Sequence, residues 1–210
     1  MDLAGYVQYG QLVSRRVDLA SGRVSLLEDE AVIEFQVSET GLIKTFGPAW
    51  QLLLIGDGQL ARHLASMASE LDYRVVICDP REAFEAAALP AGVRRSREMP
   101  DEAVQGVADQ ARTAIVALAH DPRQDDLALS AALDSQAFYI GALGSARTAK
   151  TRRERLQSLG FSTKQIARIH GPAGLYIGSK RPAEIAVSIL AEITAIRNGI
   201  AALASAPGTA

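Results

Sequence analysis

The stretch that most constrains this chain is residues 51–81, QLLLIGDGQLARHLASMASELDYRVVICDPR. Its apolar run Leu52–Ile55 stops at a glycine, which is typical of a short strand buried on both faces of a parallel sheet. Apolar residues then recur at helical spacing from Leu60 to Leu71, and Tyr73–Cys78 forms a second apolar run. The stretch therefore predicts a strand, a helix and a parallel strand, a unit that needs further strands beside it.

A glycine turn joins the first predicted strand to its helix. Gly56, Gly58 and Ala61 fit the pattern G-x-G-x-x-G/A. In this pattern the first glycine permits the turn, the second lets a pyrophosphate approach the backbone, and the small third residue lets helix and strand pack closely. Asp79 follows Gly58 by about twenty residues, near the usual distance for a carboxylate that holds a ribose hydroxyl. Asp57, by contrast, is expected to place a negative charge inside the turn.

The glycine turn predicts a dinucleotide or a similar phosphorylated ligand, because the N-terminus of the following helix offers free N–H groups to an anion. The alternative is a turn that serves tight packing alone.

The chain after residue 81 repeats the alternation of strand and helix. Strands are predicted at 93–95, 113–119 and 138–140, and helices at 82–88, 101–110, 123–133, from 146 to Gly160, at 162–169 and from Pro182 to Asn198. Strands separated by helices, with right-handed crossovers, give an α/β fold with a doubly wound, Rossmann-like parallel sheet. Its simplest strand order is 3-2-1-4-5.

Ligands of such a sheet bind beyond the carboxyl ends of the strands, at the switch point between the first and fourth strands. Four polar or glycine-rich loops are predicted to meet at that edge. The candidate binding residues are Gly56, Gly58, Gln59, Asp79, Arg81, His120, Asp121, Gly141, Gly144, Ser145 and Arg147.

Several of these residues have more than one interpretation. His120 could contact the ligand, act as an acid or base, or only belong to a helix-capping turn with Asp121. Ser145 can cap its helix while the preceding glycines expose N–H groups, which predicts a second anion site, and Arg147 could add charge. Arg81 either clamps a phosphate or pairs with Asp79.

Other polar residues are assigned structural roles. His63 and His170 default to structure, and the remaining basic residues of the helix after Ser145 are expected to form a solvated face. On the last helix Glu184, Ser188 and Glu192 recur every four residues, which predicts a polar stripe that faces solvent unless the loop before it brings it to the crevice. No set of residues has metal-ligand spacing, so no metal site is predicted.

Residues 1–50 differ from the rest of the chain in their pattern of apolar residues. Alternating apolar residues flank Ser21-Gly22 and Thr40-Gly41, which predicts two β-hairpins, and Gly47-Pro48 marks a boundary before a domain at 51–199. Two hairpins are too small to hold a core alone, so we expect them to lie against the sheet or to pair with another chain, and their open edges favour a homodimer. Residues 200–210 are expected to form a flexible tail.

Composition excludes several classes of protein. A net charge of −2 gives no electrostatic footprint for nucleic acid. No apolar run approaches the roughly 18 residues of a membrane span, and MDLAGYVQYG lacks a signal-peptide pattern, so the cytoplasm is the expected location. The single cysteine, Cys78, lies in a predicted strand and is expected to be buried and unreactive.

The chain resembles the xanthine dehydrogenase accessory (XdhC/CoxI) family over about residues 51–199. The matching segments are LLLIGDGQLARHLASMASELDYRVVICDPR, AHD, YIGALGSARTAKTRRERLQSLG, RIHGPAGLYIG and KRPAEIAVSILAEITAIRNG, in that order. Residues 1–50 lack the family's N-terminal S-x-P-R-x-x-G and G-G-x-x-E segments, so a partner is expected to complete the site. The family's first turn commonly reads G-A-G-H, where this chain has Asp57 and Gln59, and Gln59 is therefore expected to be a contact and not a histidine equivalent.

The resemblance implies an accessory or chaperone role in the maturation of molybdenum hydroxylases. It implies binding of the molybdopterin cofactor, assistance in its sulfuration, and delivery to a xanthine dehydrogenase-type apoenzyme, with a cysteine desulfurase as a further partner. The alternative is an NAD- or NADP-dependent oxidoreductase that uses the same crevice with His120 as proton donor, and the lack of a Tyr-x-x-x-Lys pair disfavours it. A third interpretation is a scaffold with an empty pocket, held together through its hairpins.

Overall fold

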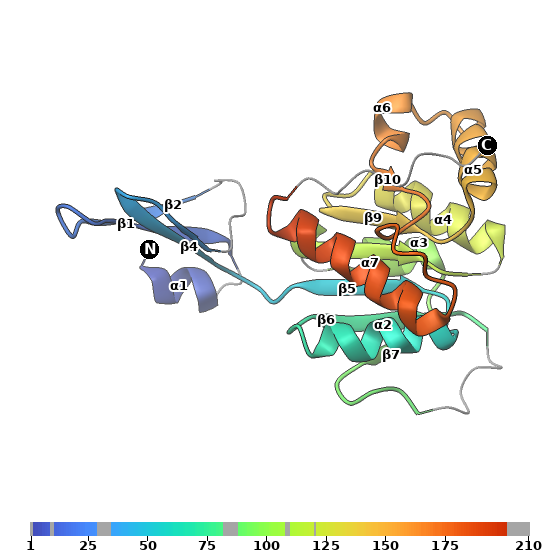
Figure 1. Cartoon of the computed structure of the whole chain (residues 1–210), viewed down its shortest axis with the longest axis horizontal. Coiled ribbons are helices and arrows are strands. Elements are labelled where there is room, and N and C mark those ends of the chain that lie inside the picture. Colours follow the sequence, from blue (N-terminus) through green and yellow to red (C-terminus); the bar gives the residue numbers. More distant parts are fainter. Residues whose placement is uncertain are drawn as a thin grey trace. The chain divides into compact units, whose positions relative to one another are not determined.

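The computed structural model describes residues 2–8, 11–28, 35–81, 88–107, 110–119 and 121–200 (Figure 1). The chain forms two compact units, Met1–Ala49 and Trp50–Ala210. Three predictions fall outside the described residues: the helix at 82–88 except for Ala88, His120, and the tail from residue 201 onward.

The first unit is a small antiparallel sheet with a short helix. It contains α1 (Leu3–Gln8), β1 (Val13–Asp18), β2 (Val24–Leu27), β3 (Phe35–Val37) and β4 (Gly41–Phe46), and the strand order is β2-β1-β4-β3. The two predicted hairpins are therefore present, and β1 and β4 join them into one sheet. Within the sheet the buried hydroxyls of Ser14 and Thr45 lie 2.8 Å apart across β1 and β4.

The second unit is built on a six-stranded parallel sheet. Its strands are β5 (Gln51–Ile55), β6 (Arg74–Cys78), β7 (Arg94–Ser96), β8 (Thr113–Ala117), β9 (Tyr139–Ala142) and β10 (Ile169–His170). The order is β10-β9-β8-β5-β6-β7. The five predicted strands thus have the predicted order, and the fold class is confirmed.

Two helix predictions were wrong in their bounds. The predicted helix at 162–169 is the short α6 (Thr163–Ile166), after which the chain forms the additional strand β10 beside β9. The predicted helix at 101–110 is α3 (Pro100–Gln105), because Gly106 ends it, and a 3-10 turn at Gln110–Arg112 leads into β8.

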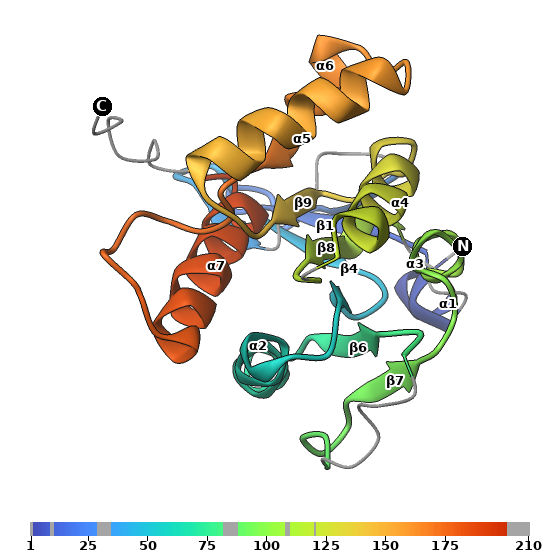
Figure 2. The same ribbon diagram turned by 90° about the vertical axis from the view of Figure 1, so that its right-hand side faces the viewer.

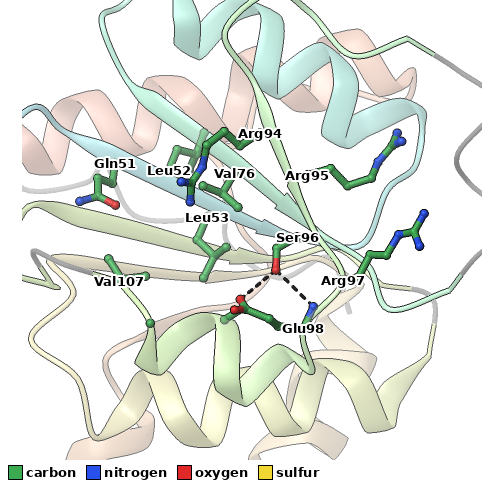
Figure 3. Close-up of a pocket in the computed structure, with 12 residues that line it drawn as sticks. Gln51, Leu52, Leu53, Val76, Arg94, Arg95, Ser96, Arg97, Glu98 and Val107 are labelled. Atoms are coloured by element: carbon green, nitrogen blue, oxygen red, sulfur yellow. Dashed lines mark hydrogen bonds between the residues drawn. The ribbon is translucent and has the colours of Figure 1, made fainter.

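Helices cover both faces of the sheet (Figure 2). The strand β5 leads into α2 (Gln59–Ser69), which packs against α7 (Pro182–Arg197) on one face of the sheet. The other face carries α3 and α4 (Pro122–Leu133), with α5 (Ala146–Ser158) beyond them. On this second face a hollow of about 790 Å³ remains between the β5–β7 side of the sheet and α3 (Figure 3).

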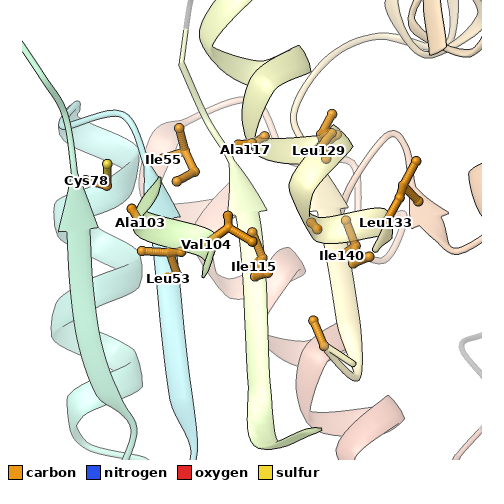
Figure 4. Close-up of a cluster of buried hydrophobic side chains, with 14 of the residues drawn as sticks. Leu53, Ile55, Cys78, Ala103, Val104, Ile115, Ala117, Leu129, Leu133 and Ile140 are labelled. Atoms are coloured by element: carbon orange, nitrogen blue, oxygen red, sulfur yellow. The ribbon is translucent and has the colours of Figure 1, made fainter. Parts of the chain in front are cut away.

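The core on the α3 and α4 face consists of aliphatic side chains from alternate strand positions (Figure 4). Leu53, Ile115 and Ile140 project from three neighbouring strands and meet Val104 of α3 and Leu129 of α4. Cys78 is also buried there, as predicted, and burial together with the charges of Asp79 and Glu98 raises the pKa of its thiol to about 12. A neutral thiol of this kind is a packing group and not a nucleophile.

Across the described ranges, every helix is too short or too polar to span a lipid bilayer.

The helix α4 offers a matched test of this core. Leu129 is fully buried, whereas Leu127, two residues earlier, is 40% exposed. Leu129→Ala should lower the free energy of unfolding by about 2–5 kcal/mol, because it opens a cavity in the core, and Leu127→Ala by much less. Urea denaturation of both variants checks this, and equal losses would contradict the packing described.

Candidate ligand-binding site

The glycine turn after β5 contains two glycines with different structural roles. Gly56 has φ +103°, and a Cβ at this position would lie 3.0 Å from the backbone of Ala119, so the fold itself requires glycine there. Gly58 has an ordinary extended conformation, φ −120° and ψ 179°, and a Cβ built on it meets no atom within 4 Å. Gly58 is also the N-cap residue of α2, and no side chain caps this helix. Within the described part of the chain, the first N–H groups of α2 thus have no capping side chain.

Asp57 does not place an unpaired charge in this turn, contrary to expectation. Its side chain is buried, and it pairs with Arg62 of α2 at 3.1 Å and with Arg95 of β7 at 2.8 Å. Two guanidinium groups thus compensate the negative charge beneath the turn, and they connect the ends of β5 and β7 to α2.

Asp79, at the end of β6, is held by groups of the same chain. One carboxylate oxygen accepts hydrogen bonds from the Asp57 backbone N–H at 2.9 Å and from Arg81 Nη2 at 2.7 Å, and the other accepts from the backbone N–H and Nε of Arg81. Burial works to raise the pKa of Asp79, but these hydrogen bonds outweigh it, so the pKa is lowered. Of the two interpretations of Arg81, the structure has the pair with Asp79.

The second glycine turn follows β9. Gly141 lies against the ring of Tyr139, Gly144 lies against Thr148, and the Ser145 hydroxyl caps α5 by accepting from the Thr148 N–H at 3.1 Å. Arg147 is exposed on the first turn of α5. The cap predicted for Ser145 is present, so its hydroxyl is already engaged.

A buried ion pair holds the backbone beside both glycine turns. Asp125 of α4 and Arg152 of α5 lie 3.0 Å apart, each about 4% exposed at the side chain. Asp125 also accepts from the Ala119 N–H, and Arg152 donates to the Leu143 carbonyl. Burial raises the pKa of Asp125 to about 6, although Arg152 and the Ala119 N–H act to lower it. The pair fixes the chain where β8 and β9 end.

The prediction of a solvated basic face on α5 was wrong for two of its arginines. Arg152 is buried, and Arg155 makes a two-point ion pair with Asp126, at 2.6 Å and 2.9 Å. Both Asp125 and Arg152 were missed as site-supporting residues. The helical spacing of Asp125 could have shown that it is buried, because it lies three and four residues before the buried Ala128 and Leu129 and so on the same face of α4.

A second buried carboxylate lies on the opposite face, in α7. Glu192 is 5% exposed and accepts hydrogen bonds from Tyr139 Oη at 2.6 Å and the Gly174 N–H at 2.7 Å, and its other oxygen lies 3.1 Å from His170 Nδ1. Of the two interpretations of this polar stripe, solvent exposure is wrong for Glu192 and Ser188, because the loop before α7 covers both side chains through Gly174 and Leu175. His170 stacks on the Tyr139 ring at 4.8 Å. Burial acts to raise the pKa of Glu192, but its hydrogen bonds outweigh this effect and lower the pKa.

The predicted loops do converge at the carboxyl edge of the sheet. The turn at Gly56 contacts Ala119 after β8, and the Asp57 N–H reaches Asp79 after β6. The Leu143 N–H donates to Ala117 of β8, which brings the second turn to the same edge. Gln59 is exposed there, while Asp121 caps α4 through the Arg123 N–H. Among the residues that the structure describes, no group of acidic, histidine and cysteine side chains could hold a metal ion.

Comparison with known proteins assigns the family. The XdhC Rossmann domain matches residues 52–193. The chain belongs to this family. The match confirms the resemblance drawn from the sequence motifs, and it runs from the second residue of β5 through β10 and most of α7.

Two relatives of this XdhC family chain have descriptive names. The molybdenum cofactor insertion chaperone PaoD of Escherichia coli (strain K12) is 29% identical over 152 residues, which is 72% of this chain and 42% of PaoD. A protein of Bacillus subtilis (strain 168), described as a probable subunit of xanthine dehydrogenase, is 29% identical over 168 residues, 80% of this chain and 49% of that protein. The chain thus spans less than half the length of both relatives.

A solved structure shares the fold. The crystal structure of a xanthine dehydrogenase from Bacillus halodurans superposes on this XdhC family chain with a TM-score of 0.68 and 21% identity. The superposition covers 93% of this chain and 62% of the other.

The buried pair between α4 and α5 gives a prediction for stability. Arg152→Met should lower the free energy of unfolding by about 3–5 kcal/mol, because it leaves the Asp125 carboxylate buried without its partner. The double variant Asp125→Asn, Arg152→Met should recover part of this loss, and Arg153→Met, an exposed arginine on the same helix, should cost little. Chemical denaturation of the set checks this; additive losses in the double variant would show that the pair is not coupled.

Glu192 gives a prediction for pH dependence. Its pKa in the folded protein lies below the ordinary value of 4.5, so its contribution to stability is present above that pH and is lost as the pH falls through the folded pKa. Glu192→Gln should therefore destabilise more at pH 7 than at pH values well below 4.5. Urea denaturation over this range measures the difference, with the exposed Glu154→Gln as control. A destabilisation that does not change with pH would contradict the role of the charge.

Proposed function

We propose that this chain is the ligand-binding Rossmann part of an accessory protein that inserts the molybdenum cofactor into a xanthine dehydrogenase-type molybdenum hydroxylase. The names of the relatives support the role in cofactor insertion, and family membership supports carrying it over to this chain. The ligand is a phosphorylated pterin or a nucleotide, bound at the carboxyl edge of the sheet between the two glycine turns.

Gly58 carries the proposal. Neither its backbone angles nor its packing requires glycine, since the conformation is one that any residue adopts and the space beside Cα is open. A ligand phosphate that approaches the N–H groups of α2 would require that space. The fold requires a glycine at position 56 but not at position 58, so a bound ligand would explain the glycine at 58.

The charges around the turn are consistent with an anion. Asp57 is compensated by two arginines, so it does not oppose a phosphate at the N-terminus of α2. Arg147, exposed after the second turn, supplies a cation for the remainder of the ligand.

The oxidoreductase alternative has less support. A nicotinamide cofactor at this turn would need Asp79 for its ribose hydroxyl, and both oxygens of Asp79 already accept hydrogen bonds from Asp57 and Arg81. Arg81 would have to leave before the carboxylate could accept from a ligand. We therefore propose that Asp79 positions the turn and does not contact the ligand.

The protein partners that we propose are the molybdenum hydroxylase apoenzyme, a cysteine desulfurase and a second copy of this chain.

Gly58→Val tests the ligand site. The added methyl groups should weaken binding of the released molybdenum cofactor by at least about tenfold, since they occupy the space beside the helix N-terminus. The protein should stay folded, because the cost at this N-cap position is of the order of 1 kcal/mol. Anaerobic calorimetric titration with the cofactor, NAD and NADP measures the affinities of wild type and variant.

Ser66→Val, at an exposed position on the same helix α2, is the matched control, because it introduces the same side chain away from the glycine turn. Unchanged cofactor affinity in a folded Gly58→Val protein would reject the site. Tight binding of a nicotinamide dinucleotide without any binding of the pterin would replace the chaperone by the oxidoreductase.

A further inference from the structure

The hollow on the α3 face of the sheet (Figure 3) is lined by no residue of the two glycine turns. Its volume is about 790 Å³, within the range of about 300–1,000 Å³ that is usual for small-molecule sites. It reaches from Gln51 at the start of β5 to Glu98 beyond the end of β7, and one side is formed by Ala103 and Val107 at α3. The hollow exists because α3 has only six residues, while α4 packs over β8 and β9.

The floor of the hollow is apolar with a cation at its edge. Strand register places Leu53, Val76 and Arg94 in one row across β5, β6 and β7, so their side chains project from the same face of the sheet. Leu53 and Val76 belong to or pack against the core cluster. Because β7 is an edge strand, Arg94 stands where this apolar row opens to solvent.

One of the arginines beside the hollow points over its floor. Arg94 shares the face of the sheet that forms the floor, whereas Arg95 and Arg97 point away from it (Figure 3). Arg95 is paired with Asp57, and Glu98 accepts a hydrogen bond from the Ser96 hydroxyl at 2.8 Å (Figure 3). Within the described ranges Arg94 has no ion pair, and its guanidinium is exposed beside the apolar floor.

We propose that this hollow is a second binding site, for a small amphipathic anion. The apolar body of such a ligand covers the half-buried Val76 and Val107, and its carboxylate, sulfonate or phosphate group accepts charge-assisted hydrogen bonds from Arg94. Contact of the apolar body with these valines and charge-assisted hydrogen bonds to the guanidinium together supply the affinity, and the guanidinium fixes the orientation of the ligand. The site goes beyond cofactor insertion, because no residue of either glycine turn lines it.

The dye 8-anilinonaphthalene-1-sulfonate, an apolar ring system with one sulfonate, is the probe for this site. Trp50 is the one tryptophan of the chain and directly precedes Gln51, so energy transfer from Trp50 to the dye reports dye bound near the hollow. Wild type should show saturable transfer with one dye per chain. Arg94→Gln should weaken this binding about tenfold, and Gln51→Phe, which places a ring in the mouth of the hollow, should abolish it.

Lys164→Gln on α6 removes one exposed positive charge away from the hollow and should leave dye binding unchanged. Circular dichroism confirms that each variant is folded. Unchanged dye affinity in folded Arg94→Gln and Gln51→Phe would overturn the proposal. Sedimentation analysis of wild type and Gln51→Phe tests whether the hollow is instead an interface between copies of the chain. Self-association of the wild type that is lost in Gln51→Phe would also overturn the proposal.

Discussion

Three buried aspartates hold the carboxyl edge of the parallel sheet together, and every other property of the site depends on them. Asp57, Asp79 and Asp125 are each at most 3% exposed, and each has an arginine partner from another part of the edge or from the next residues of its own loop. A carboxylate removed from water is costly unless it is paired and hydrogen-bonded. The loops that follow β5, β6 and β8 therefore hold one another in place beside the uncapped N-terminus of α2.

Much of the Rossmann unit could be predicted from the sequence, because its information is local. Short apolar runs that end in glycine or charge identify most of the strands, and the simplest order with right-handed crossovers, 3-2-1-4-5, arranges them. The strand β10 could not be predicted in this way. It has two residues and no apolar run of its own, and it exists because the chain after α6 passes beside β9.

The candidate site was predictable in position but not in chemistry. The sequence placed Gly56, Asp79 and Ser145 at one edge, since the carboxyl ends of parallel strands lie together. It did not reveal that Asp57 and Arg152 are neutralised by partners far away in the chain, because an ion pair across 27 or 38 residues leaves no periodic signal. The sequence offers one indirect sign. A charged residue that recurs at helical spacing with the apolar residues lies on the buried face of its helix, where it is expected to have an oppositely charged partner.

The last helix has a consequence for how the protein is made. All strands of the parallel sheet precede α7 in the chain, yet α7 supplies Ile189, Ile193 and the Glu192 carboxylate that complete one face. During synthesis the α3 and α4 layer can close while the Tyr139 hydroxyl on the other face is still hydrated. The face on which α2 lies is therefore completed only when α7 is added.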